Sequence, residues 1–138
     1  IGKRLLLTVE DLLSDEIPKT HPSDTLAQAA IKASEGEKGI AVVQDEKSHM
    51  LGIVTDGDIR RLVESETGFY DVTAEDVMTT DPITMSPETP AIRALEALEE
   101  HSISQLVVTD SESKFLGVVH IHDIMQEGLT TGSSNQNG

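Results

Sequence analysis

The stretch Leu51-Gly52-Ile53-Val54-Thr55-Asp56-Gly57-Asp58-Ile59 recurs 65 residues later as Leu116-Gly117-Val118-Val119-His120-Ile121-His122-Asp123-Ile124. Aligned at that offset, Thr8–Leu62 matches Thr73–Glu127 without a gap, with 15 identities in 55 pairs. A unit of this size does not readily bury its own apolar face, so two copies are expected to pack with pseudo-twofold symmetry around one core. Such symmetry predicts paired clefts between the copies, where small ligands commonly bind.

Each copy is predicted to run strand, helix, strand, strand, helix, which makes the fold class α+β. Apolar residues at spacings of three and four predict amphipathic helices over Thr25–Ser34 and Pro90–Glu100. Ser23 or Asp24 is expected to cap the first helix, and Pro90 suits the first turn of the second.

Short apolar runs joined by acidic polar turns predict two hairpins. Their strands are Gly39–Val43 with Met50–Thr55, and Gln105–Val108 with Phe115–His120. A closing helix follows each hairpin, over Asp56–Val63 and Ile121–Glu127.

The repeat sets the expected boundaries. Residues 8–70 and 71–129 form the two copies, and residues 1–7, which begin without Met, are interpreted as a linker from a preceding domain. Residues 130–138 contain Gly, Ser, Asn and Gln without an apolar pattern and are predicted to be a disordered tail.

The composition excludes several classes of protein. A net charge of −15 argues against binding to nucleic acid, and the absence of cysteine excludes disulfides and thiolate metal sites. No apolar run reaches the roughly 18 residues of a membrane helix, so we expect a cytoplasmic protein without a membrane contact. Eight of the ten Lys and Arg residues fall within residues 1–68, which favours anion binding by the first copy.

The first motif predicts an anion and sugar site. Its strand ends at Thr55, Gly57 lies in the turn, and first-turn amides of the following helix attract phosphate. The Thr55 hydroxyl can donate to a phosphate or ribose oxygen, and Asp58 can accept two vicinal ribose hydroxyls. Arg60 and Arg61 can supply forked donors to phosphate or carboxylate. The alternative interpretation is structural: Thr55 or Asp56 caps the helix, Asp58 is a favourable first-turn charge, and the arginines are solvated.

Two tandem copies with a Gly-x-x-Thr-x-x-Asp motif after the third strand resemble a pair of cystathionine-β-synthase-type (CBS) domains, over residues 8–128. The resemblance implies that Thr55 and Asp58 hold the ribose and phosphate of a nucleotide in a cleft. The second copy keeps Asp123 but has His120 in place of Thr or Ser. His120 is therefore expected to line the second cleft, and a zinc site formed by His120 and His122 is a minor alternative.

A narrower resemblance, to the arabinose 5-phosphate isomerase family, rests on Gly2–Leu7, Thr55–Arg61, Asp76–Thr79 and Gly117–Ile124. It implies an N-terminal sugar isomerase (SIS) domain in the same chain, which would carry the chemistry of Kdo and lipopolysaccharide synthesis. These 138 residues are then a regulatory, non-catalytic pair with no required cofactor, sensing a nucleotide-like effector such as CMP-Kdo. The resemblance also implies a homo-oligomer, at least a dimer.

Two alternatives remain open. The effector could be an adenine nucleotide, or the pair could be a structural oligomerisation module with empty clefts. No set of residues in the sequence has the pattern of a catalytic site, so nothing supports an enzyme formed by these residues alone.

Overall fold

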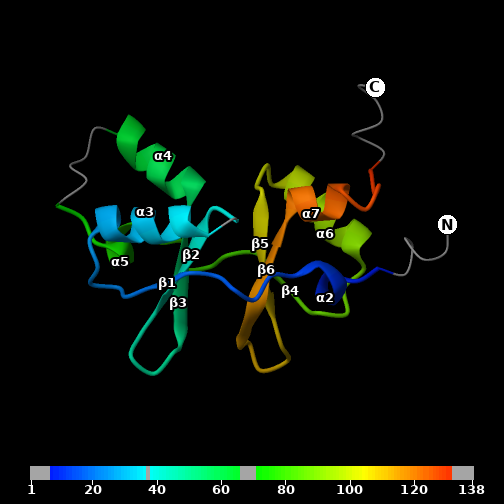
Figure 1. Cartoon of the computed structure of the whole chain (residues 1–138), viewed down its shortest axis with the longest axis horizontal. Helices are drawn as coiled ribbons and strands as arrows, with labels where there is room; N and C mark the ends of the chain where they lie inside the picture. The colour runs from blue at the N-terminus through cyan, green and yellow to red at the C-terminus, as the bar shows by residue number, and fades with distance from the viewer. Residues whose placement is uncertain (1–6, 37, 66–70, 132–138) are drawn as a thin grey trace. The chain divides into compact units, whose positions relative to one another are not determined.

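The chain folds into two compact units that interleave along the sequence, as seen in a computed structural model (Figure 1). The structure describes residues 7–36, 38–65 and 71–131. One unit is continuous, over Glu16–Pro82, and we call it the inner unit; the other combines Ile1–Asp15 with Ile83–Gly138, and we call it the outer unit. The expected linker at 1–6 and the expected tail at 132–138 lie outside the described residues, as does Gly2–Leu6 of the isomerase resemblance.

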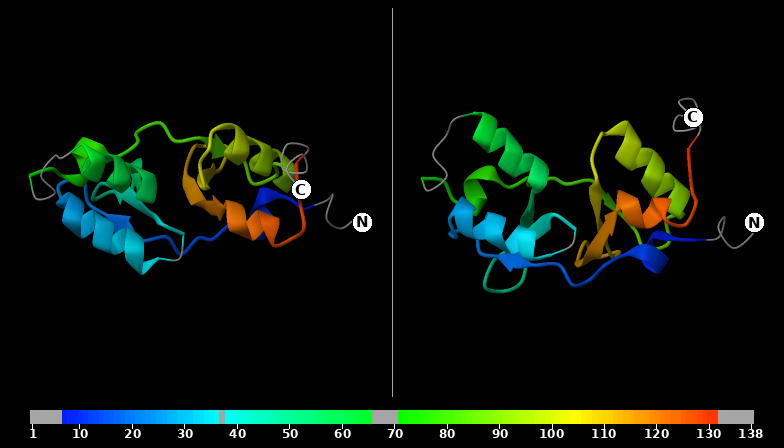
Figure 2. Two further views of the ribbon diagram at one scale, coloured as in Figure 1. Left: turned by 90° about the horizontal axis from the view of Figure 1, so that it is seen from above. Right: turned by 45° about the horizontal axis from the view of Figure 1, so that its top comes forward.

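The inner unit contains a three-stranded sheet covered by helices. The sheet order is β1-β2-β3, with β1 parallel to β2 and β2 antiparallel to β3. Helix α3 contacts all three strands and also contacts α4 (Figure 2). The elements are β1 (Lys19–Thr20), α3 (Leu26–Glu35), β2 (Ile40–Gln44), β3 (Met50–Thr55), α4 (Asp56–Glu64) and α5 (Ala74–Val77).

The outer unit repeats this design. Its sheet order is β4-β5-β6, again with a parallel pair followed by an antiparallel pair. The elements are α2 (Val9–Leu12), β4 (Thr84–Met85), α6 (Ala91–Glu100), β5 (Gln105–Thr109), β6 (Phe115–His120) and α7 (Ile121–Met125). The α+β repeat predicted from the sequence is therefore confirmed, with the strands and main helices within two residues of the expected bounds.

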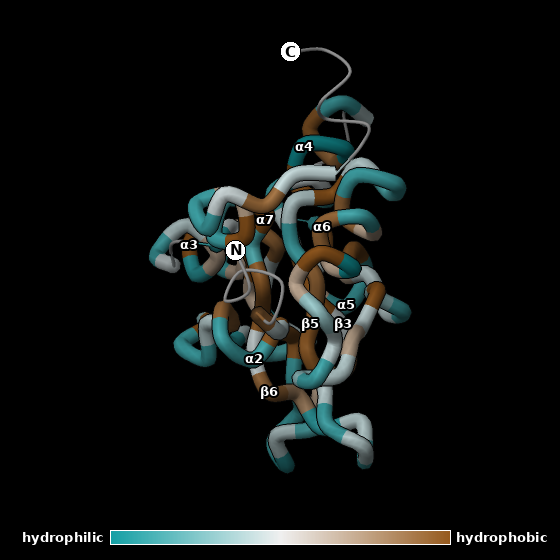
Figure 3. Tube along the Cα trace, turned by 90° about the vertical axis from the view of Figure 1, so that its right-hand side faces the viewer, coloured by the Kyte–Doolittle hydropathy of each residue, from teal (hydrophilic) through white to brown (hydrophobic). Residues whose placement is uncertain are grey.

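Each unit has an apolar core where the helices meet the sheet. In the inner unit the core includes Leu26 of α3, Val43 of β2 and Val54 of β3, all fully buried. In the outer unit Leu95 and Leu98 of α6 pack with residues of β5 and β6, which are strongly hydrophobic in Figure 3. Burying each such Leu side chain contributes about 1.5–3 kcal/mol, so these helix faces stabilise the fold of each unit.

Two predicted helix starts need correction. Thr25, and not Ser23 or Asp24, is the N-cap of α3: its hydroxyl accepts from the amide of Gln28 at 3.1 Å, and the Gln28 side chain accepts from the Thr25 amide at 2.8 Å. Such a reciprocal capping box satisfies two otherwise unpaired amides. Pro90 is the N-cap of α6 and precedes its first turn.

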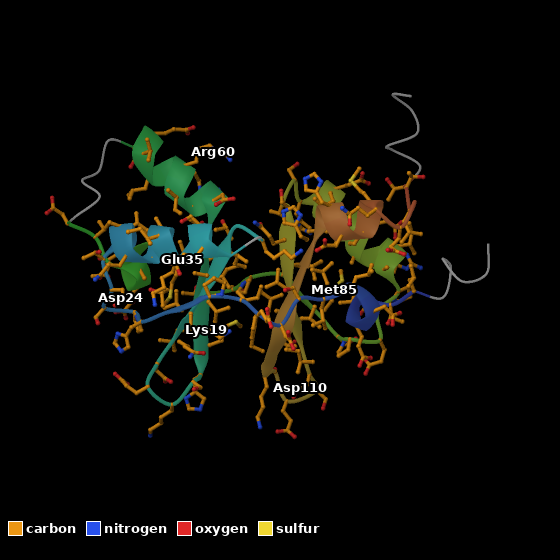
Figure 4. All side chains as sticks on the ribbon, viewed as in Figure 1. Lys19, Asp24, Glu35, Arg60, Met85 and Asp110 are labelled. Carbon is orange, nitrogen blue, oxygen red and sulfur yellow. The ribbon has the colours of Figure 1, made fainter. Side chains whose placement is uncertain are left out.

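Asp24 instead closes the loop before α3. Its carboxylate accepts from the Thr20 hydroxyl at 2.8 Å and from the His21 amide at 2.9 Å, while its backbone carbonyl accepts from the Ala74 amide at 2.8 Å (Figure 4). The His21 amide, with the Thr20 hydroxyl, stabilises the ionised form and lowers the pKa of Asp24 below its ordinary value of 3.8. Asp24 therefore ties the loop to the start of α5.

Each sheet also pairs with a segment that comes from the other sequence copy. Thr79 and Ile53 exchange two backbone hydrogen bonds, of 3.0 and 2.8 Å, in the inner unit. Ser14 and Val118 do the same in the outer unit, at 2.8 and 2.9 Å. In the alignment of the copies Ser14 corresponds to Thr79, so both linking segments make the same contact.

A glycine makes each of these contacts possible. A Cβ atom on Gly52 would lie 2.6 Å from the Thr79 carbonyl oxygen, and one on Gly117 would lie 2.5 Å from that of Ser14. Both distances are shorter than a van der Waals contact, and the opposing atoms are backbone. The repeated Gly is therefore explained by packing.

We expect Gly52→Ala to lower the free energy of unfolding by about 1–3 kcal/mol, because the methyl group must displace backbone that is held by two hydrogen bonds. Gly57→Ala is the matched control: its Cβ would have no neighbour closer than 3.5 Å, and alanine is favoured over glycine in a helix by up to about 1 kcal/mol. Urea unfolding of both variants checks this. Equal midpoints for the two variants would contradict the packing role of Gly52.

The second prediction concerns the pH dependence of the free energy of unfolding. Because the pKa of Asp24 is lowered on folding, its stabilisation is complete above the unfolded value and disappears as the pH falls through the folded one. Asp24→Asn should cost about 1 kcal/mol at pH 7, and this difference from wild type should shrink as the pH falls below 3.8, the ordinary pKa of the carboxyl. Urea unfolding from pH 7 to pH 2.5 measures it, with the exposed Asp81→Asn as a control for charge. A difference that is constant with pH would contradict the role of the Asp24 carboxylate.

Candidate ligand site

The candidate site lies where β3 ends and α4 begins, in the inner unit. Thr55 is the N-cap of α4, and its hydroxyl accepts from the Asp58 amide at 3.3 Å. The Asp58 carboxylate in turn accepts from the Thr55 amide at 2.9 Å and from the Thr55 hydroxyl at 3.2 Å. The structural interpretation of Thr55 as a helix cap is therefore correct, and the capping box sets the positions of both side chains.

Asp58 is a buried carboxylate with several donors. Its side chain is only 6% exposed, and one of its oxygens pairs with Nη2 of Arg61. The Thr79 hydroxyl donates to the same carboxylate, with oxygen distances of 3.2 and 3.5 Å. Burial of a charge requires such compensation, so the site supplies a carboxylate of fixed position.

Two other capping boxes show what is distinctive here. Thr8 with Asp11, and Thr73 with Asp76, form the same reciprocal contacts at the starts of α2 and α5. Asp11 and Asp76 are exposed, however, whereas Asp58 is buried. The Thr-x-x-Asp spacing alone therefore indicates a helix cap, and burial against Thr79 and Arg61 distinguishes Asp58.

The two arginines of α4 differ. Arg61 pairs with Asp58 and also lies near Gly57, where an added Cβ atom would be 3.5 Å from Nη1 of Arg61. Arg60 is on the exposed side of the helix (Figure 4). The structure thus brings together Thr55, Gly57, Asp58 and Arg61, and leaves Arg60 directed to solvent.

The second motif has a different chemistry. His120 is the N-cap of the five-residue helix α7, and its Nδ1 accepts from the His122 amide at 3.1 Å. The two imidazole rings stack, with centroids 4.9 Å apart, and Asp123 lies in the first turn, half-buried. Within residues 7–36, 38–65 and 71–131 no group of three or more potential ligands could hold a metal ion.

Sequence reasoning missed Thr79 as a site residue. Its hydroxyl reaches Asp58 across 21 positions of the chain, because the backbone of Thr79 pairs with Ile53 beside the motif. The available signal was the recurrence of a hydroxyl at Ser14 and Thr79 in the aligned copies.

Both copies match the family model for the CBS domain, over residues 9–65 and 74–129. The chain therefore belongs to the CBS domain family and carries two copies of the domain. Among curated relatives, arabinose 5-phosphate isomerase KdsD of Francisella tularensis is 37% identical over 128 residues, which are 91% of this chain and 39% of the relative. The chain spans about two-fifths of the length of the curated relatives it matches.

Solved CBS pairs share the fold. The CBS pair of MJ0100, in complex with 5'-methylthioadenosine and S-adenosyl-L-methionine, has a TM-score of 0.76 and 24% identity, covering 88% of this chain and 94% of that one. PAE2072 of Pyrobaculum aerophilum, complexed with AMP, has a TM-score of 0.75 and 23% identity, covering 85% and 89%. In the described part of the chain, no helix is long and apolar enough to cross a membrane.

The role of the Thr79 hydroxyl can be tested by a substitution that removes the hydroxyl and keeps the shape of the side chain. Thr79→Val should lower the free energy of unfolding by about 1–2 kcal/mol, because it removes a donor to a buried carboxylate, whereas Thr79→Ser should retain most of the stability. A double-mutant cycle with Asp58→Asn, measured by urea unfolding, isolates the interaction. Equal losses for the Val and Ser variants, with no coupling to Asp58, would contradict the contact.

Proposed function

We propose that this CBS pair binds a nucleotide-like anionic effector and regulates a sugar-phosphate isomerase in the same chain. The observation that carries the proposal is the buried Asp58 carboxylate, held by Thr55 and Thr79 at the start of α4. A positioned carboxylate is suited to accept vicinal ribose hydroxyls, and the amides of a helix start, with Arg61 beside them, favour an anion.

The relatives support the choice of enzyme. Residues that make up most of this chain are similar to arabinose 5-phosphate isomerases, and the share of those relatives beyond the match leaves room for a separate catalytic domain. We propose that the parent is a D-arabinose 5-phosphate isomerase of Kdo synthesis, with an SIS domain preceding the pair. As parts of the same proposal, the protein is cytoplasmic and assembles as at least a homodimer.

The effector is proposed to be CMP-Kdo or another nucleotide. CMP-Kdo carries a ribose, a phosphate and a carboxylate, which fit Asp58, the start of α4 and the arginines, including the solvent-directed Arg60. Adenine nucleotides are the second candidate, because two structures with the same fold were solved with AMP or with adenosine derivatives. His120 and Asp123 are proposed to line a second site of different preference.

The alternative from another class is a purely structural oligomerisation module with empty clefts. The capping geometry of Thr55 and Asp58 favours it, since those contacts stabilise α4 in the absence of any ligand. Ligand-induced stabilisation separates the two proposals.

The test is thermal unfolding with CMP-Kdo, CMP, AMP, ATP, S-adenosylmethionine and arabinose 5-phosphate. A ligand at 100 times its Kd should add about 2.7 kcal/mol, which raises the Tm by roughly 10 °C. The shift should disappear in the double variant Thr55→Ala/Asp58→Asn and persist in Thr73→Ala/Asp76→Asn, which breaks the equivalent capping box on α5.

Size-exclusion chromatography of both double variants checks that the substitutions do not change the size of the oligomer. A shift with CMP-Kdo alone supports an end-product sensor, and a shift with adenine nucleotides supports the second candidate. No shift with any compound at millimolar concentration would overturn ligand sensing and favour the structural role.

A further inference from the structure

Arg61 occupies the carboxylate that the proposed function assigns to a ligand. Its Nη2 pairs with Oδ1 of Asp58, and its Nη1 lies 3.5 Å from the position of a Cβ atom on Gly57. The guanidinium therefore lies across the first turn of α4, beside both the ribose acceptor and the anion-attracting amides.

The carboxylate of Asp58 has little capacity for further donors. It already accepts from the Thr55 amide, the Thr55 hydroxyl, the Thr79 hydroxyl and Arg61. Two carboxylate oxygens offer about four lone-pair directions, so an incoming pair of hydroxyls must displace a donor.

Arg61 is the donor that can leave at least cost. Thr55 is fixed as the cap of α4, and Thr79 is fixed by two backbone hydrogen bonds to Ile53. The Arg61 side chain is 69% exposed and can rotate into water without any movement of the backbone. An exposed arginine is also the group that most readily re-forms a forked pair with phosphate or carboxylate.

We infer that Arg61 determines ligand specificity: it is a resident counter-ion that a ligand must displace from Asp58 and then pair with through its own anionic group. The inference rests on the proposed function and adds a rule of selection. A neutral nucleoside displaces Arg61 from Asp58 without offering it another anion. A nucleoside monophosphate offers its phosphate as the new partner of Arg61. The site should therefore require vicinal hydroxyls and an anion in one molecule.

The repeat provides an internal contrast. In the alignment of the copies Gln126 stands at the position of Arg61, and Met125 at that of Arg60. The second motif keeps its aspartate, Asp123, but lacks the corresponding guanidinium. Selection by this mechanism thus belongs to the first motif only.

Isothermal titration with AMP, adenosine, CMP and cytidine tests the inference on wild type and on Arg61→Gln. In wild type each monophosphate should bind at least tenfold more tightly than its nucleoside. In Arg61→Gln the nucleosides should bind several-fold more tightly and the monophosphates more weakly, so the ratio should fall about tenfold or more. Arg61→Lys, which keeps the charge without the fork, should give an intermediate ratio.

Arg93→Gln is the matched control. Arg93 also pairs with a carboxylate three residues away on a helix, Glu96 at 3.4 Å, but that carboxylate is exposed, and the replacement of Arg93 changes the net charge equally. In Arg93→Gln the ratio of monophosphate affinity to nucleoside affinity should equal that of wild type. If wild type binds monophosphates but Arg61→Gln leaves the ratio unchanged, or weakens both classes equally, this inference fails while the proposed function stands. If wild type binds none of the four compounds, the inference fails, and the panel containing CMP-Kdo then decides the proposed function separately.

Discussion

The close backbone approach at Gly52, where Thr79 pairs with Ile53, is the constraint on which the rest of the inner unit depends. Two hydrogen bonds join the segment after α5 to the middle of β3, and any side chain at position 52 would separate them. The same pairing of Ser14 with Val118 beside Gly117 positions α2 in the outer unit. Each sheet is thereby completed by a segment from the other sequence copy.

That approach also creates the chemistry of the site. It places the Thr79 hydroxyl against Asp58, so that the carboxylate is held from the helix side by Thr55 and from the sheet side by Thr79. A charge held on two sides keeps its position whether or not Arg61 remains. Packing and ligand chemistry therefore depend on the same few atoms, and a variant in this region has to be measured for both.

Local sequence patterns were sufficient to predict the helices and strands, but they did not predict the long-range contacts. The apolar spacing in Thr25–Ser34 predicted a helix, and the apolar run Met50–Thr55 predicted a strand; the structure contains them as Leu26–Glu35 and Met50–Thr55. The cap of α3 was misplaced because Ser23, Asp24 and Thr25 are all good capping residues, and only the reciprocal contact with Gln28 selects Thr25. The partner of Asp58 across the chain could not be read from spacing, because it depends on where the segment around Thr79 returns to the sheet.

The order of the two units along the chain has a consequence for synthesis. All residues of the inner unit lie between the two parts of the outer one, so the inner unit is complete once Pro82 has been made. Ser14, in contrast, must wait for Val118, a delay of roughly 5–20 seconds at ordinary rates of translation. During that interval the apolar residues flanking α2 have no sheet to cover them. Within these two units, the inner one can therefore fold completely while the segment around Ser14 still awaits the sheet that it will join.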